Sequence, residues 1–195
     1  MSPGRLEAFS DGVIAVIITI MVLELKIPHG TGWATLQPLW PVFLSYVLSF
    51  VNIGIYWNNH HHFLQAVEHV DGRVLWANLH LLFWLSLIPF ATGWMGENHF
   101  AAFPIATYAF VLFMASLAWK PFHRAVVAAN PDSLLSKVVG ERDWKSIAPP
   151  LMYGAAIALA FVSTWVSGAL IVAVAMMWFI PERRIEERIE QQEQA

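Results

Sequence analysis

The chain has 195 residues, of which 57% are hydrophobic and only 13% are charged, and its mean hydropathy is +0.55. Soluble domains contain about 25% charged residues, so the composition predicts a single-domain integral membrane protein over residues 1–195. A formal net charge of −3 does not indicate a nucleic-acid partner, and the absence of cysteine excludes disulfides, thiolate metal sites and cysteine catalysis. Glu7 and Asp11 precede the first apolar run, and no small-residue cleavage site follows it, so we expect this segment to be retained.

The first apolar segment, predicted as a helix over residues 6–27, has charged residues at both ends. Its apolar or small residues run from Gly12 to Leu23, which gives about 18 Å of helix, whereas the hydrocarbon core of a bilayer is about 30 Å thick. To span it, the helix must take Asp11 and Glu24 into the low-dielectric region. Charges at that depth are tolerated where they face protein or water, so we expect this helix to be surrounded by other helices or to line an aqueous path.

The remaining apolar segments predict five further spans: 39–57, 74–95, 100–119, 147–164 and 168–181. Pro89 interrupts the third span of the chain. The last two spans come from one apolar block that would be about 51 Å long as a single helix, so we divide it near Trp165–Gly168. Residues 182–195 are predicted to form a charged, solvated helical tail.

The distribution of basic residues sets the expected orientation. With six spans and the N-terminus inside, Lys26 is the only one of the 11 Lys and Arg residues on the outer side, as the positive-inside rule favours. A five-span alternative would move the arginines of the tail to the outer side and weaken this bias. The sequence therefore predicts an all-α, multi-pass membrane protein with six transmembrane helices and both termini in the cytoplasm.

An apolar stripe runs along the first predicted helix. Val16, Ile20, Leu23 and Ile27 follow i, i+4, i+7, i+11 spacing and share one face, with Thr19 beside them. Such a stripe is typical of a lipid-facing or packing surface. Alternatively it forms a hydrophobic constriction that gates by dewetting, in which Thr19 supplies a ring of hydroxyls if several subunits place it on a common axis.

Polar residues gather at the inner end of the same helix. Arg5 and Asp11 lie on different faces, and Asp11 is one turn from Glu7, a like-charge pair that needs a donor or a cation. The donors expected at this end come from the second and third helices: Asn58, Asn59, His60, His61, His62, Asn78 and His80. Their network either holds the first helix upright or acts as a titrating latch, since histidine changes charge near neutral pH.

The histidines and tryptophans have simpler interpretations. Three adjacent histidines on a helix point in three directions and no H-E-x-x-H motif is present, so we expect no cofactor and no metal beyond permeant ions. Most of the 10 tryptophans, including Trp57, fall near predicted helix ends, as interfacial belts require. The sequence contains no nucleophile elbow, P-loop or Rossmann motif that would indicate an enzyme. It also lacks the T-V-G-Y-G loop of a conventional potassium filter.

Three motifs carry a family resemblance. The R-x-x-x-F-S-D pattern of Arg5, Phe9, Ser10 and Asp11 resembles the signature of the endolysosomal potassium channel family, transmembrane protein 175, in its bacterial branch. The Y-W-x-N-H-H pattern at 56–61 resembles that family's helix 2 signature. The W-x-N pattern that begins at Trp76, followed by L-x-P-F at 87–90, resembles its helix 3 signature, so the likeness covers essentially the whole chain.

The resemblance implies a homotetrameric cation channel that prefers potassium, in which caesium or protons are further permeant ions. It implies that helix 1 lines a central pore, with gate positions at Val16, Ile20 and Leu23 and a pore threonine at Thr19. Val16 is smaller than the isoleucine or leucine typical of that position, so Ile20 or Leu23 becomes the narrowest point.

The resemblance also implies a stabilising network and a location. In the network, Arg5 and Asp11 join a helix 2 histidine, either His60 or His61, near Asn78. A single-repeat chain of this kind implies a prokaryotic plasma membrane.

Two alternatives stay open. A proton-coupled or other secondary transporter would show saturable flux and usually a broken helix at mid-membrane, for which Pro89 is the candidate. A redox or metal protein would use the histidines.

Overall fold

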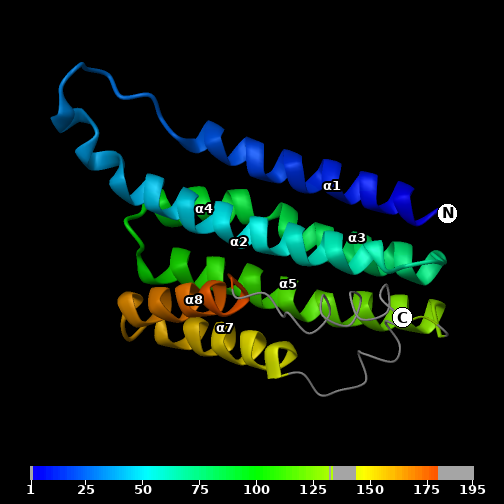
Figure 1. The fold of residues 1–195 in the computed structure, drawn as a ribbon. Helices are drawn as coiled ribbons and strands as arrows, with labels where there is room; N and C mark the ends of the chain where they lie inside the picture. Colours follow the sequence, from blue (N-terminus) through cyan, green and yellow to red (C-terminus); the bar gives the residue numbers. More distant parts are fainter. Residues whose placement is uncertain (1, 132, 134–143, 180–195) are drawn as a thin grey trace, which may run out of the picture.

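The computed structural model describes residues 2–131, 133 and 144–179 (Figure 1). Every regular element in these residues is helical: α1 Pro3–Ile20, η1 Met21–Glu24, η2 Trp33–Thr35, η3 Gln37–Leu39, α2 Trp40–Gln65, α3 Gly72–Ser86, α4 Ile88–Glu97, α5 Ala102–Ala129, η4 Trp144–Ser146, α7 Ala148–Leu159 and α8 Thr164–Phe179. The all-α prediction is therefore confirmed for this part of the chain. The predicted tail at 182–195 and the end of the last span lie outside the described residues.

The helices form a layered bundle with α1 on one side (Figure 1). Helix α1 packs on α2 and α3, α2 packs on α4, and α5 packs on α3, α4 and α7. Helices α7 and α8 contact each other on the side away from α1. The bundle thus leaves the far side of α1 without a neighbour from the described chain.

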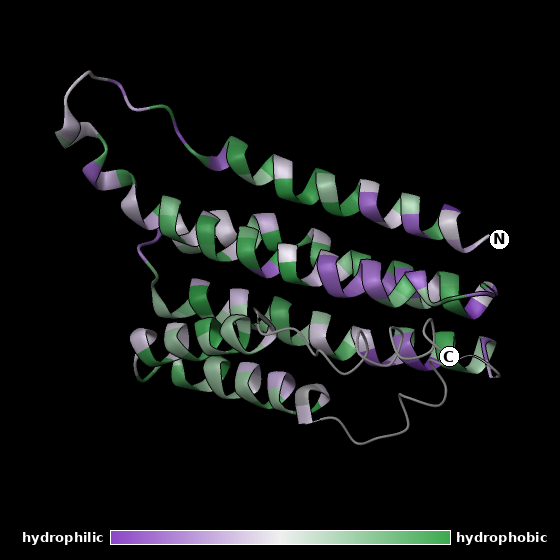
Figure 2. Ribbon diagram, in the orientation of Figure 1, coloured by the Kyte–Doolittle hydropathy of each residue, from purple (hydrophilic) through white to green (hydrophobic). Residues whose placement is uncertain are grey.

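Four helical segments are long and apolar enough to cross a membrane: Pro3–Glu24, Trp33–Gln65, Gly72–Glu97 and Ala102–Ala129. Helices α7 and α8 have 12 and 16 residues, about 18 and 24 Å, which is less than the roughly 30 Å of a hydrocarbon core. Hydrophilic residues gather at the end of the bundle where α1 begins and α2 ends (Figure 2). The chain is a multi-pass membrane protein with one strongly polar end.

The helices extend beyond the predicted spans where polar residues continue them. Helix α2 continues from Trp57 to Gln65, and α5 continues from Trp119 to Ala129 through Pro121. Hydropathy marks only the part of a helix inside the hydrocarbon, so the predicted spans stop at Trp57 and Trp119, before these polar turns. The predicted first helix, 6–27, is too long at its C-terminal end. Leu25 is extended after η1, and Pro28 disfavours a helical conformation at Ile27.

The structure contains both interruptions that were expected in the apolar segments, one at Pro89 and one in the last apolar block. The third span is interrupted next to Pro89, where α3 ends at Ser86 and α4 begins at Ile88, because proline lacks the N–H that would continue the helix. The last apolar block divides into α7 and α8. The division lies at 160–163 rather than near Trp165–Gly168, because a single glycine is tolerated inside a helix and Gly168 lies within α8.

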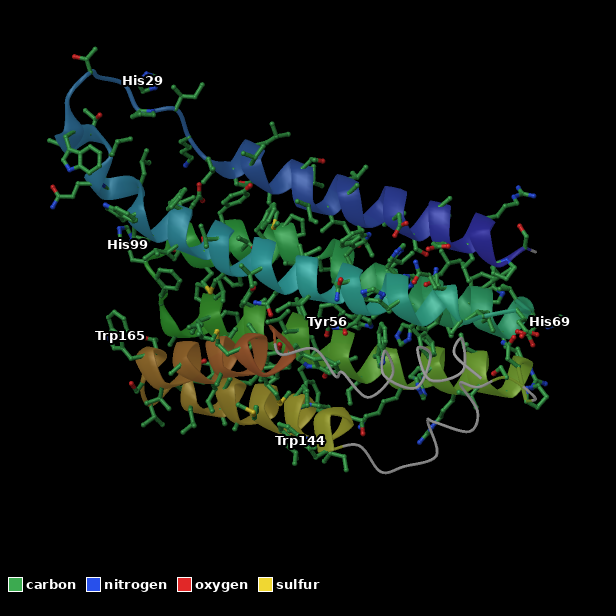
Figure 3. All side chains as sticks on the ribbon, in the orientation of Figure 1. His29, Tyr56, His69, His99, Trp144 and Trp165 are labelled. Atoms are coloured by element: carbon green, nitrogen blue, oxygen red, sulfur yellow. The ribbon has the colours of Figure 1, made fainter. Side chains whose placement is uncertain are left out.

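Buried polar side chains link the helices inside the bundle, where Tyr56 also lies (Figure 3). The Ser49 hydroxyl lies 2.6 Å from the Thr92 hydroxyl and donates to the Tyr108 hydroxyl at 2.9 Å, joining α2, α4 and α5. At the polar end, the Asn130 side chain accepts from the His69 amide at 2.7 Å and donates to the His69 carbonyl at 3.0 Å. This clamp fixes the α2–α3 connection on the end of α5.

Candidate functional site

Helix α1 has two different faces. Its buried face carries Leu6, Ser10, Ile14 and Ile17 and continues into Met21 of η1. The residues predicted to line a pore lie on the opposite face, where Val16 is 57%, Ile20 39% and Leu23 79% exposed. Thr19 is exposed on the same face. One side of the helix therefore packs into the subunit, and the other presents an apolar surface with one hydroxyl.

The Thr19 hydroxyl is held by its own helix. It lies 2.9 Å from the Ala15 carbonyl and 3.0 Å from the Val16 carbonyl, to which it donates. A hydroxyl has one hydrogen and two lone pairs, so this hydrogen is committed to the backbone. The oxygen keeps its lone pairs for a group approaching the exposed face.

A buried chain of hydrogen bonds anchors the N-terminal half of α1 to α3 and α2. The Asn78 amide donates to the Ser10 hydroxyl at 2.9 Å, and the Ser10 hydroxyl donates to the Leu6 carbonyl at 2.8 Å. The Asn78 carbonyl oxygen lies 2.8 Å from His60 Nε2. Because that oxygen only accepts, His60 Nε2 carries the proton, and its buried Nδ1 has no hydrogen-bond partner.

The acidic residues of α1 face the next turn of α2. The Trp57 indole N–H donates to Asp11 Oδ1 at 3.0 Å. Glu7 Oε1 lies 2.9 Å from His61 Nδ1, but the contact lacks the alignment of a hydrogen bond. The Trp57 and His61 rings stack with centroids 5.6 Å apart. The like-charge pair on α1 therefore meets an indole donor and an imidazole from α2.

The structure brings together only some of the predicted network. Ser10, Asn78 and His60 form one buried chain, whereas Asp11 bonds Trp57 rather than a histidine. Arg5 and Phe9 are exposed, and Arg5 makes no ion pair within the described residues.

Trp57 was assigned to an interfacial belt, so its bond to Asp11 was missed. Its i, i+4 spacing to His61 was the available signal, because it places both rings on one face of α2.

Surface contacts hold the segment that follows α1, from η1 to Lys26. Lys26 Nζ lies 2.6 Å from Glu97 Oε1. The hydrogen bond and the negative charge of Glu97 raise the pKa of Lys26 above its ordinary value. The Glu24 side chain packs against Gly93 of α4, where an added Cβ would come within 3.1 Å of its carboxylate. Among the described residues, the buried polar contact between η1 and α4 is the long one from the Thr92 hydroxyl to the Met21 sulfur, at 4.0 Å. It is weaker than the Ser10–Asn78 hydrogen bond at 2.9 Å.

The fold and the site define a class: a multi-pass α-helical membrane protein in which one helix has an apolar face left free of the subunit. The sequence model described as "Endosomal/lysosomal potassium channel TMEM175" matches residues 5–89. A potassium channel of Chryseobacterium sp. (strain P1-3) is 47% identical over 191 residues, which is 98% of this chain and 100% of that protein. The chain belongs to the TMEM175 family, as its motifs predicted.

Two other relatives extend the comparison. The crystal structure of a lysosomal potassium-selective channel TMEM175 homolog from Chamaesiphon minutus has a TM-score of 0.78 and 28% identity, and covers 90% of this chain and 95% of that chain. The human endosomal/lysosomal proton channel TMEM175 is 26% identical over 184 residues, which is 84% of this chain and 36% of that protein. These relatives are channels, in agreement with the prediction that the chain is not an enzyme.

Proposed function

We propose that this protein is a potassium-preferring cation channel that conducts passively, down the electrochemical gradient. The observation that carries the proposal is the free apolar face of α1 and η1, on which Val16, Thr19 and Ile20 of α1 and Leu23 of η1 are exposed while the opposite face is buried. The relatives named potassium channels support the same function.

The proposed assembly is a homotetramer with four copies of α1 around a central pore. A single chain exposes the α1 face, and an apolar helix face needs a partner or lipid to cover it. We further propose that residues 1–195 form one channel domain with six transmembrane helices, α7 and α8 completing the last two. The protein would lie in a prokaryotic plasma membrane with both termini in the cytoplasm. The start of α1, the start of α3 and the end of α5 lie at the same end of the bundle (Figure 1), and their sequences contain Arg5, Arg73 and Arg124, as the positive-inside rule favours.

Ion selectivity in the proposed pore comes from a narrow constriction rather than from fixed charge. Between Gly12 and Leu23 the exposed face carries no carboxylate. Ile20 or Leu23 would form an apolar constriction that closes by dewetting. Next to this constriction, Thr19 would present its hydroxyl oxygen to a partly dehydrated cation, because the hydroxyl hydrogen is committed to the backbone.

Flux measurements test this function. Purified protein in potassium-loaded liposomes should give a non-saturating flux, and in a planar bilayer the reversal potential should favour potassium and caesium over sodium. A pH gradient without potassium measures protons separately, since vertebrate relatives are named proton channels. Saturable, substrate-dependent flux would support the transporter alternative, and the absence of current in every monovalent cation would contradict the channel.

A further inference from the structure

We propose that Glu7 and Asp11 of α1, with His61 of α2, form a binding site for a divalent transition-metal cation of the Zn²⁺ type. One potential ligand atom from each residue lies within 4.8 Å of the other two. The set combines two carboxylate oxygens and one imidazole nitrogen, which are Zn²⁺ ligands. The site is independent of the pore function proposed above.

The position of the three ligands follows from the helix geometry. Glu7 and Asp11 are four residues apart, so their carboxylates lie on one face of α1. His61 reaches them from α2, and all three side chains are half-buried. Only one of the three adjacent histidines takes part, so their divergent directions do not weaken the site. The expectation of no bound metal rested on the histidines, although the Glu7–Asp11 pair was expected to need a donor or a cation.

The His61 imidazole offers an unused nitrogen beside the Glu7 carboxylate. Oε1 and Nδ1 are 2.9 Å apart, an ion-pair distance, yet the buried Nδ1 has no hydrogen-bond partner. Ligands of one tetrahedral ion, each about 2.1 Å from the metal, are about 3.4 Å apart, so these two atoms would move slightly apart to hold a cation.

Electrostatics also favours a cation here. Two carboxylates one turn apart repel, and within a membrane span a charge needs a partner. Among the described residues, neither carboxylate forms an ion pair with a lysine or arginine, and His61 is the one basic group recorded against Glu7. A divalent ion would neutralise both charges.

The surroundings supply an orienting shell. The Gln65 amide nitrogen lies 2.9 Å from His61 Nε2. When a metal binds, we expect this amide to turn so that its oxygen accepts from Nε2–H and the Nδ1 lone pair faces the ion, because metal-bound histidines usually donate their other N–H. Trp57 stacks on the His61 ring and donates to Asp11, which holds two of the three ligands in place.

The test is a titration of the chelator-stripped, detergent-purified full chain with Co²⁺, followed by its visible absorption, and then displacement by Zn²⁺. We expect one equivalent per chain. Glu7→Gln and His61→Gln should each weaken binding by at least tenfold, and Gln65→Ala by about tenfold. His62→Ala is the matched control, because His62 is the exposed neighbour outside the cluster, and it should bind as the wild type does.

Elution volume on size exclusion checks that each variant is folded, and the isosteric Glu7→Gln change keeps the volume of the side chain. The proposal would be overturned if the wild-type chain bound no Co²⁺ beyond the level of the Glu7→Gln variant. It would also be overturned if folded Glu7→Gln and His61→Gln variants bound with unchanged affinity, or if His62→Ala alone abolished binding.

Discussion

The two ends of α1 are held in different ways. In the N-terminal half, Ser10 and Asp11 accept hydrogen bonds from the Asn78 and Trp57 side chains. Beyond the C-terminal end, buried apolar packing gives way to an exposed ion pair between Lys26 and Glu97, a type of contact that adds little stability and is screened by salt. The helix on which the proposed pore depends is therefore fixed by polar bonds in its N-terminal half, and mainly by packing toward its C-terminal end.

The largest effect on stability should come from breaking the buried Ser10–Asn78–His60 chain at Asn78. Asn78→Ala removes the acceptor of the buried His60 N–H and the donor to Ser10. An unsatisfied buried donor together with the lost volume should cost about 3 kcal/mol in the free energy of unfolding, measured by denaturation in mixed micelles. Asn59→Ala is the control, because the Asn59 amide donates only to Ile55 of its own helix. Equal losses in the two variants would mean that the anchor does not hold α1.

The middle of α1 should be next in sensitivity. Ile17 is 3% exposed and Ile20 is 39% exposed, three residues apart on the same helix. Ile17→Ala should cost about 2 kcal/mol, at the low end of the usual range, because lipid is as apolar as the core and only packing is lost. Ile20→Ala should change the unfolding free energy of the subunit by less than about 0.5 kcal/mol. A reversed order would contradict the assignment of the two faces.

The Trp57 contact should have a smaller effect. Trp57→Phe keeps a ring beside His61 but removes the N–H that bonds Asp11, which should cost about 1 kcal/mol at this partly exposed site. A double-mutant cycle with Asp11→Asn isolates the pair, and we expect a coupling energy of about 1 kcal/mol. In the proposed channel, Asp11→Asn should reduce assembly or opening more than ion selectivity. A coupling energy near zero would mean that Asn78 alone anchors the N-terminal half of α1.

The sequence predicted these features unevenly, for physical reasons. Apolar runs located α1 and the break at Pro89, and spacing placed Val16, Ile20 and Leu23 on one face, because periodicity and proline act locally. The polar turns of α2 beyond Trp57 carry no hydropathy signal.

The partners of the α1 side chains are set by packing between helices. Ser10, Asn78 and His60 were expected at one end of the bundle, but the pairing of Asp11 with Trp57 depends on how α1 rotates against α2. That rotation is a property of the whole interface, which no short motif encodes.

The smallest effect on stability should accompany the largest effect on conduction. Leu23 is 79% exposed, so Leu23→Asn should change the unfolding free energy of the subunit by less than about 0.5 kcal/mol. In the proposed pore, an amide at this position would hydrate the constriction, so closed-state potassium leak should rise severalfold and preference over sodium should fall. Val22→Asn is the matched control, because Val22 is an exposed neighbour outside the Val16, Ile20, Leu23 stripe. Since both variants add the same amide to the same turn, unchanged currents in Leu23→Asn, or equal changes in the two, would remove this face of α1 from the conduction path. A change confined to Leu23→Asn would connect the exposed apolar face of α1 and η1 with ion flow. The hydrogen bonds of Ser10 and Asp11 would then serve to hold the helix in position.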